Sequence, residues 1–328
     1  MTNFSIIIPM YNIAEYLERC INSVYDQDID ESKFEIILVN DGSPDNSVEV
    51  ATLLTKNRTN VKIISQKNKG LGGARNTGID NAKGRYIIFL DADDYLLPNK
   101  LEFLYKQAIK YNLDILEFGS EGVTSQGSVI YRKSKTGHGK PLTGQKYQAS
   151  INYMVSACNK LYATSLLKHN KLRFLERVFI EDIEFNTRVF LYAKRVMATP
   201  VVCAHFVSTQ GSITRDVSPE KQYKMMDDML EVITIINDFV KNNYPEDSVA
   251  KPRLQKRISN LTISLLNRSM HYSGNIKKQK NIIVQLQSRG LYPVVNRTDS
   301  SKQNIYRLFA NCEFVYLLFC RIKNLLNN

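Results

Sequence analysis

The stretch "YIIFLDADDYLLP", Tyr86–Pro98, decides how this chain can fold. Its first part is a run of β-branched and aromatic residues, which is typical of a strand buried on both faces. Three carboxylates follow the run, on Asp91, Asp93 and Asp94. Crowded carboxylates repel one another, and burying them is costly unless a cation lies among them. The stretch therefore raises the question of which cation completes it.

Two interpretations of this acidic segment stay open on the residues alone. Mg²⁺ is commonly held by one or two carboxylates together with substrate phosphates, and Asp91 and Asp93 would supply that pair. Alternatively, the segment is a solvated loop in which Asp93 or Asp94 caps the next helix.

Short apolar runs alternate with segments of helical spacing through the first half of the chain. This alternation predicts an α/β fold, a Rossmann-like and mostly parallel sheet flanked by helices. Ligands bind beyond the carboxyl ends of the strands in such sheets. Three of the runs end in polar residues, which we expect at one edge of the sheet: Pro9–Asn12, Asn40–Ser43 and Asp91–Asp94. The four predicted strands are Ser5–Pro9, Phe34–Asp41, Val61–Ser65 and Arg85–Asp91.

The segment "NKGLGGARNTG", Asn68–Gly78, offers both glycines and a fork of donors. Its glycines would let a ligand approach the backbone, and Arg75 would bind a phosphate, ribose or base. The alternative is a strand–helix turn whose arginine makes a structural ion pair. Asp41 could likewise cap a helix, and Tyr11 could be an ordinary packed aromatic.

The net charge is concentrated in the last quarter of the chain. The 328 residues carry a formal charge of +12, and the segment Ala250–Asn328 alone holds 14 Lys and Arg against 2 acids. A basic segment of this kind predicts an acidic partner, such as phospholipid, nucleic acid or a phosphorylated acceptor.

Cysteine usage and hydropathy indicate the compartment. The five scattered cysteines form no CxxC pair and fit reduced cytosolic thiols. The amino terminus lacks the features of a signal peptide, and no apolar run reaches the ~18 residues of a spanning helix. We therefore expect a cytoplasmic protein.

Four motifs, "SIIIPMYN", "VNDGSPDNS", "NKGLGGARNTG" and "FLDADD", stand in the order typical of one family. Together they resemble family 2 glycosyltransferases with the GT-A fold, of the type that builds bacterial surface polysaccharide or glycan. The resemblance covers about residues 3–215 and implies transfer of a sugar from a UDP-sugar with Mg²⁺ or Mn²⁺. Processive members of the family carry a QxxRW motif, and this chain has no Trp. The resemblance therefore implies a non-processive enzyme.

The resemblance also assigns roles to residues. Asp41 would accept from the uracil ring, Arg75 would contact the nucleotide, and Asp91 would hold the ribose or share the metal. Asp93 would bind the metal that bridges the diphosphate. The nucleotide-sugar site would comprise Pro9, Tyr11, Asn12, Glu15, Asp41, Arg75, Asp91, Ala92 and Asp93.

An inverting member of this family needs a general base for the acceptor hydroxyl. In "FIEDIEFNTRVF", we expect Asp182 to be the base, with Glu181 as the fallback and a helix-capping acid as the alternative. Weaker assignments are Lys160 at the acceptor side, Ser212 and Arg215 over the diphosphate, and His205 as a third metal ligand or a structural histidine.

The carboxyl-terminal region is predicted to be a basic helical extension. We place the catalytic domain at residues 1–215 and the extension at 216–328. One helix over Asn304–Leu326 would either lie on an anionic membrane surface, which would make the protein peripheral there, or pack on the catalytic domain. Its predicted apolar stripe is Ile305, Leu308, Phe309, Cys312, Tyr316, Phe319 and Ile322.

The expected acceptor is a hydroxyl on a glycan or a polyprenyl-linked sugar. Two other classes of protein are the alternatives. A sugar-1-phosphate nucleotidyltransferase would carry its Gly-rich signature directly after the first strand, where "IPMYNIAEY" has none. A basic nucleic-acid-binding protein would carry a zinc, helix-turn-helix or RNA-recognition signature, and none is found, so no nucleic acid is expected.

Overall fold

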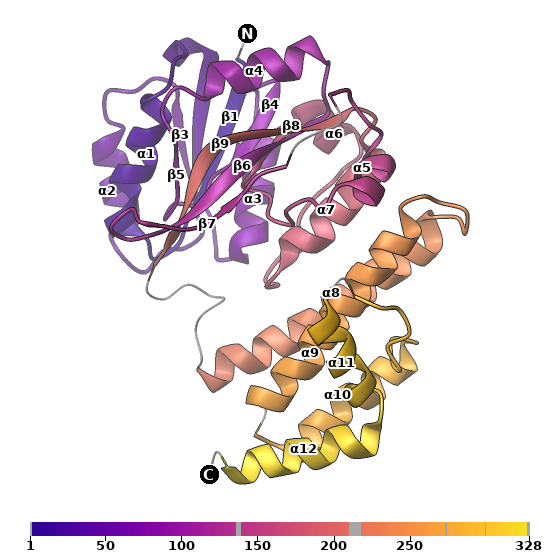
Figure 1. Ribbon diagram of the computed structural model, residues 1–328. Coiled ribbons are helices and arrows are strands. Elements are labelled where there is room, and N and C mark those ends of the chain that lie inside the picture. The colour runs from indigo at the N-terminus through magenta and orange to yellow at the C-terminus, as the bar shows by residue number, and fades with distance from the viewer. Residues whose placement is uncertain (1, 136–138, 210–217, 273, 299, 327–328) are drawn as a thin grey trace. The chain divides into compact units, whose positions relative to one another are not determined.

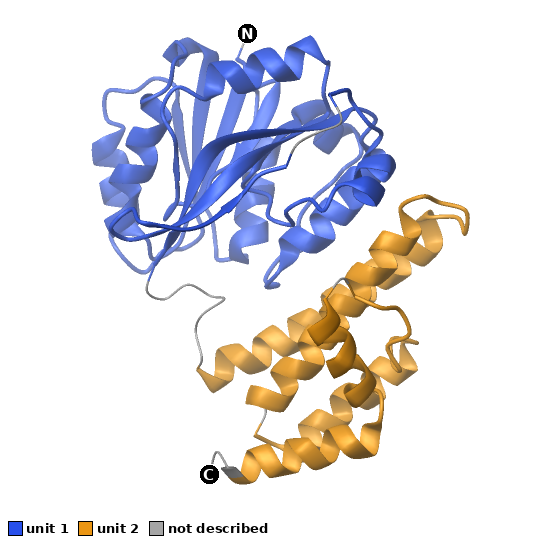
Figure 2. Ribbon diagram, in the orientation of Figure 1, with its two compact units in different colours: residues 1–210 blue, residues 211–328 orange. Residues whose placement is uncertain are grey.

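The computed structural model describes residues 2–135, 139–209, 218–272, 274–298 and 300–326 (Figure 1). The chain divides into two compact units, Met1–Gln210 and Gly211–Asn328 (Figure 2). The boundary predicted between residues 215 and 216 lies outside the described residues.

Unit 1 is built on one mixed sheet, which has nine strands among the described residues (Figure 1). The strand order is β3-β2-β1-β4-β8-β6-β9-β5, and β7 pairs with β6. The strands are β1 (Phe4–Met10), β2 (Phe34–Asn40), β3 (Val61–Ser65), β4 (Tyr86–Phe89), β5 (Tyr95–Leu96), β6 (Ile115–Thr124), β7 (Val129–Lys133), β8 (Lys160–Ala163) and β9 (Val196–Ser208).

Helices flank this sheet in Figure 1. They are α1 (Leu17–Tyr25), α2 (Ser47–Leu54), α3 (Gly70–Asn81), α4 (Leu101–Lys110), α5 (Gly144–Ser150), α6 (Thr164–His169) and α7 (Glu181–Tyr192), with short 3₁₀ turns η1 (Ala14–Tyr16) and η2 (Glu31–Lys33).

The first four strands are parallel neighbours, as the sequence predicted. β1 pairs in parallel with β2 and with β4, and β2 pairs in parallel with β3. Every residue of β1 and β4 is buried, which explains their unbroken apolar sequence. β3 lies at the edge of the sheet and is only half-buried, because it has a neighbour on one side alone.

The glycines of "NKGLGGARNTG" serve packing within the protein. Most of the motif is helix α3 rather than a turn. A Cβ added at Gly72 would lie 2.0 Å from the carbonyl oxygen of Leu175, and one added at Gly78 would lie 2.3 Å from Cγ2 of Ile7. These two glycines therefore let α3 approach β1 and the segment before α7, which corrects the expectation that they admit a ligand.

The described part of unit 2 consists of helices and connecting loops, without a strand. Its helices are α8 (Pro219–Asn243), α9 (Lys251–Tyr272), α10 (Ile276–Ser288), α11 (Ser301–Ala310) and α12 (Glu313–Leu326). None of the helices in the described ranges combines the length and the hydropathy that crossing a membrane would require.

The single helix predicted over Asn304–Leu326 is wrong. The chain breaks after Ala310, where the side chain of Asn311 accepts from the amide of Val294 at 2.8 Å and donates to its carbonyl at 3.0 Å. The break also divides the predicted stripe, because Tyr316 is fully buried while Ile305 is 71% exposed.

Candidate active site

The carboxyl ends of β1, β2 and β4 meet at one edge of the sheet. The amide of Asp41 donates to the carbonyl of Met10 at 2.9 Å, and the amide of Leu90 donates to the carbonyl of Ile7 at 3.0 Å. The three polar strand ends are therefore neighbours, as the sequence predicted.

Most of the residues predicted to bind the nucleotide lie along this edge. Pro9 is buried within β1, while Tyr11 is 54% exposed and Asn12 adopts a left-handed φ of 53°. Glu15 is exposed in η1. Asp41 is buried and accepts two hydrogen bonds at Oδ1, from Gln66 Nε2 at 2.7 Å and the Lys69 amide at 2.8 Å. These bonds fix the Asp41 carboxylate at the start of α3, so it does not cap the following helix, α2, as the alternative suggested.

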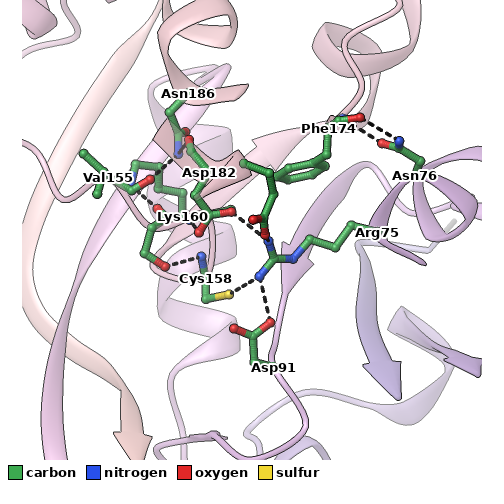
Figure 3. Close-up of polar contacts among 12 residues, drawn as sticks. Arg75, Asn76, Asp91, Val155, Cys158, Lys160, Phe174, Asp182 and Asn186 are labelled. Atoms are coloured by element: carbon green, nitrogen blue, oxygen red, sulfur yellow. Dashed lines mark hydrogen bonds and ion pairs between the residues drawn. The ribbon is translucent and has the colours of Figure 1, made fainter. Parts of the chain in front are cut away.

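Arg75 is the centre of the site. Its side chain is 1% exposed. Nη1 donates to Glu181 Oε1 and to Asp182 Oδ1, both at 2.7 Å, and Nη2 donates to Asp91 Oδ1 at 2.8 Å. Figure 3 shows the guanidinium between Asp91 and Asp182. This cation joins the acidic motif after β4 to the acidic pair at the start of α7. Asp91 lies 16 residues after Arg75 in the sequence, and Glu181 lies 106 residues after it.

This arrangement answers part of the question raised by the acidic stretch. Arg75 is one cation beside the stretch, and within the protein it donates to Asp91, Glu181 and Asp182. Burial lowers the pKa of Arg75, but the surrounding carboxylates, Asp182 first among them, raise it well above its usual value. One cation faces three carboxylates here, so the cluster as a whole keeps an excess of negative charge.

Apolar and weakly polar groups surround the cluster. The guanidinium lies 5.2 Å from the ring centroid of Phe174, which itself stacks on Phe185 at 3.7 Å. Nη2 also donates to Cys158 Sγ at 3.5 Å, and burial raises the pKa of that thiol. An environment of this kind strengthens each ion pair, since little water screens it.

Glu181 and Asp182 differ in exposure, and the pKa of each is raised. Burial and the neighbouring charge of Asp182 raise the pKa of Glu181 to about 7. Burial also raises the pKa of Asp182, against the lowering effect of Arg75. The Asp182 side chain is 19% exposed and that of Glu181 is 7% exposed. Asp182 is thus the more accessible of the two carboxylates.

The Asp182 carboxylate is held from both sides. Its Oδ2 accepts from the amide of Ala157 at 2.9 Å, opposite the Arg75 bond to Oδ1. The turn before Ala157 is fixed by Lys160, whose buried Nζ donates to the carbonyls of Met154 and Ser156 at 2.6 and 2.7 Å. Lys160 is therefore a structural cation in the interior. Its burial excludes the solvated lysine of the alternative, and the acceptor-side role stays a prediction.

Backbone strain precedes the acidic pair. Ile180 adopts φ 60° and ψ 27°, the left-handed region, as the residue before α7. A β-branched residue in this region costs roughly 1–3 kcal/mol and persists only where its surroundings impose it. Glu181 and Asp182 follow this residue in the first turn of α7, where both accept from Arg75.

The acidic motif after β4 has a second set of contacts. Asp94 Oδ1 accepts from the amide of Val207 in β9 at 2.8 Å, and Asp93 Oδ2 accepts from Thr209 Oγ1 at 3.2 Å. The motif is therefore tied to β9 and does not cap a helix. Burial, together with the charge of Asp91, raises the pKa of Asp93.

The carboxylates of Asp91 and Asp93 fit a divalent cation that is shared with substrate oxygens. The mutual repulsion that raises the pKa of Asp93 would be relieved by a cation between Asp91 and Asp93. Ala92 lies buried between them. Within the described ranges, no three His, Cys, Asp or Glu side chains form a metal site by themselves. A small cation would thus need further ligands from a diphosphate and water.

His205 does not have the geometry of a metal ligand. Its Nδ1 pairs with the Tyr95 hydroxyl at 2.8 Å, and its Nε2 pairs with Glu121 Oε2 at 3.0 Å. Both ring nitrogens are thus engaged, which favours the structural role. The predicted Ser212 and Arg215 lie outside the described residues.

Sequence reasoning missed Arg19. Its Nη2 donates to the carbonyl of Asp93 at 2.8 Å, and its guanidinium lies 5.0 Å from the ring centroid of Tyr95. It therefore places a second cation beside the acidic motif, from helix α1. Nothing in the segment "YLERC" distinguishes this arginine from a solvated one.

Comparisons with known proteins agree with this fold and site. Residues 5–170 match the family model described as glycosyl transferase family 2. The glycosyltransferase GlyA of Streptococcus pneumoniae serotype 4 is 26% identical over 98% of this chain and 46% of its own length. EpsJ of Bacillus subtilis, an uncharacterized glycosyltransferase, is 37% identical over 58% of this chain and 57% of its own. The chain thus spans about half the length of these two relatives.

A solved structure gives the fold class. The crystal structure of S. aureus TarS 1-349 in complex with UDP-GlcNAc has a TM-score of 0.72 at 23% identity, covering 99% of this chain and 89% of that one. The architecture is accordingly the GT-A fold that the sequence predicted. The chain belongs to glycosyl transferase family 2.

Proposed function

We propose that this chain is an inverting, metal-dependent, non-processive glycosyltransferase that moves a sugar from a UDP-sugar to a hydroxyl acceptor. The observation that carries the proposal is the pair of acidic groups on either side of Arg75. One group, Asp91 with Asp93, follows β4, and the other, Glu181 with Asp182, begins α7. A transferase needs two such functions side by side, one for the diphosphate and one for the acceptor.

The donor is assigned to the edge formed by β1, β2 and β4. TarS, a protein of the same fold, was crystallised with UDP-GlcNAc, which supports a uridine nucleotide. Tyr11 exposes half of its ring beside Asn12 and Glu15, where a base could stack, and Asp41 lies buried next to it. Arg75 would act on the nucleotide through Asp91 rather than by direct contact.

Asp91 and Asp93 would hold Mg²⁺ or Mn²⁺. When bound, the cation would neutralise charge that develops on the diphosphate leaving group. The protein's own contribution is to fix the two carboxylates, through Arg75 on Asp91 and Thr209 on Asp93.

Asp182 would act as the general base. Its side chain is the more exposed of the pair, whereas Glu181 is more deeply buried and has a pKa raised to about 7. Asp182 would take the proton of the acceptor hydroxyl as that oxygen bonds to the anomeric carbon and the bond to the diphosphate breaks. One displacement of this kind inverts the anomeric configuration.

The acceptor would be a hydroxyl of a glycan or a polyprenyl-linked sugar in surface polysaccharide synthesis. The names of two bacterial relatives, GlyA and EpsJ, support sugar transfer in general and give no acceptor. We infer a cytoplasmic enzyme that works at the inner face of the plasma membrane, because a polyprenyl acceptor would be embedded there. Membership of glycosyl transferase family 2 argues against the nucleotidyltransferase and nucleic-acid-binding alternatives.

The test is calorimetry of the full chain with UDP, in the presence and absence of Mn²⁺. We expect binding that depends on the metal and that Asp93→Ala abolishes. Asp247→Ala, which removes an exposed carboxylate in unit 2, is the matched control and should bind as the unchanged chain does. Equal UDP affinity in Asp93→Ala, or no response to Mn²⁺, would overturn the metal assignment.

A further inference from the structure

Helix α12 is apolar on two opposite faces. One face holds Tyr316 and Cys320, both fully buried, and the Tyr316 hydroxyl donates to the carbonyl of Leu266 in α9 at 2.9 Å. This face packs against α9 and α10 within unit 2. A helix at the surface of a domain normally turns charged or polar residues outward on the other side.

The outward face of α12 instead carries large apolar side chains. Phe314 and Leu325 are 76% and 77% exposed, and Leu318 and Ile322 are 43% and 45% exposed. Their spacing of four, four and three residues places them on one stripe of the helix. Within the described part of unit 2, nothing covers this stripe.

The stripe continues onto α11. Phe319 of α12, which is 50% exposed, meets Phe309 of α11 with ring centroids 4.8 Å apart. On α11, Ile305 and Leu308 flank Phe309 and are 71% and 66% exposed. We call this surface the α11–α12 apolar face, and it comprises Ile305, Leu308, Phe314, Leu318, Phe319, Ile322 and Leu325.

The size of the face indicates an interaction site. Seven large side chains at these exposures form an apolar surface on the order of several hundred Å², and contiguous patches of that size mark protein or membrane contacts. Apolar residues scattered singly would carry no such meaning.

The charges around the face distinguish between occupants. Lys302 is exposed one turn before Ile305, and Arg321 is exposed on α12 beside Leu318. The segment from Ala250 to Asn328 carries a net charge of +12. A second copy would bring the same positive charge against it, whereas an anionic surface would be attracted.

We propose that the α11–α12 apolar face docks on an anionic lipid bilayer. Helix α12 would lie in the interface plane with Phe314, Leu318, Ile322 and Leu325 among the acyl chains. Lys302 and Arg321 would contact the lipid headgroups. The proposal goes beyond the transfer reaction, and it holds whether or not the catalytic assignments do.

Vesicle flotation of the full chain tests the docking, without any donor or acceptor. We expect binding to phosphatidylcholine vesicles that contain phosphatidylglycerol and little binding to phosphatidylcholine alone. The double variant Phe314→Ser with Leu318→Ser should lower the partition coefficient about tenfold or more, because it removes apolar surface from the interface. Lys302→Gln and Arg321→Gln should each lower the partition coefficient about fivefold, and the effect should be smaller at high salt.

Val249→Ser is the matched control, since Val249 is 58% exposed in unit 2 but lies before α9. It should leave flotation unchanged, and circular dichroism should show equal helix content in all variants. Light scattering at several protein concentrations completes the experiment. Equal binding of the double variant, a preference for neutral vesicles, or a dimer that the double variant dissociates would each overturn the proposal.

Discussion

Replacing Arg75 by methionine is the sharpest test of how this site is built. The change keeps much of the side-chain volume but removes the one cation that donates to Asp91, Glu181 and Asp182 at 2.7–2.8 Å. Breaking a buried ion pair by removing one partner costs about 3–5 kcal/mol. With Arg75 only 1% exposed, we expect a loss of this size in the free energy of unfolding near pH 7.5, measured by urea denaturation.

The loss should depend on pH in a defined direction. Arg75 lowers the pKa values of Glu181 and Asp182, so its removal raises both in the folded state. A carboxyl whose folded pKa lies above its unfolded pKa destabilises the fold as the pH rises between the two values. The variant should therefore recover part of its lost stability at about pH 5.5, where the carboxyls take up protons.

Arg58→Met is the matched control, since Arg58 pairs with Glu31 at the surface, with side chains 40% and 49% exposed. Exposed pairs contribute about 1 kcal/mol or less, so this variant should remain close to the unchanged chain. A loss below about 1 kcal/mol in Arg75→Met, or a loss that stays constant between the two pH values, would refute the reasoning about a buried cation among three carboxylates.

Three further predictions concern neighbouring residues. Asp182→Asn should lower kcat by about 10²–10⁴-fold while calorimetric UDP affinity holds, and a drop in affinity alone would contradict its role as base. Glu181→Gln should make the free energy of unfolding less dependent on pH between 4.5 and 7. In the unchanged chain the raised pKa of Glu181 lowers that free energy by up to about 3 kcal/mol across this range. An unchanged pH dependence in urea denaturation would count against this role. Gly72→Ala should lower the unfolding free energy by about 1–3 kcal/mol, because its Cβ would lie 2.0 Å from the Leu175 carbonyl, and a neutral effect would show that the close packing is relieved easily.

The local pattern was enough for the first four strands. The predicted runs correspond to β1, β2, β3 and β4. Period and apolar content decide these elements, because each is stabilised by burying the side chains of its own segment. The meeting of the polar strand ends followed as well, since parallel neighbours end at the same edge.

Contacts between segments that are distant in the sequence could not be predicted from the local pattern of residues. The break between α11 and α12 depends on Asn311 bonding to Val294, and the helical spacing of the sequence runs through it without a signal. The role of the glycines in α3 depends on which segment packs against them, and the sequence shows the glycine but not the neighbour. Lys160 and Arg19 resemble surface cations in the sequence, and only their burial or their partners give them a structural role.

The sequence by itself determined the family, the first four strands and the edge of the sheet where the acidic residues gather. Tertiary structure alone decided which cation meets those acids. Arg75, Asp91 and Glu181 are far apart along the chain, and their pairing arises because α3, the end of β4 and the start of α7 converge on one buried point. Removing these charges from water costs free energy, and their mutual attraction offsets that cost only where all the partners meet, so no local pattern of residues encodes the arrangement.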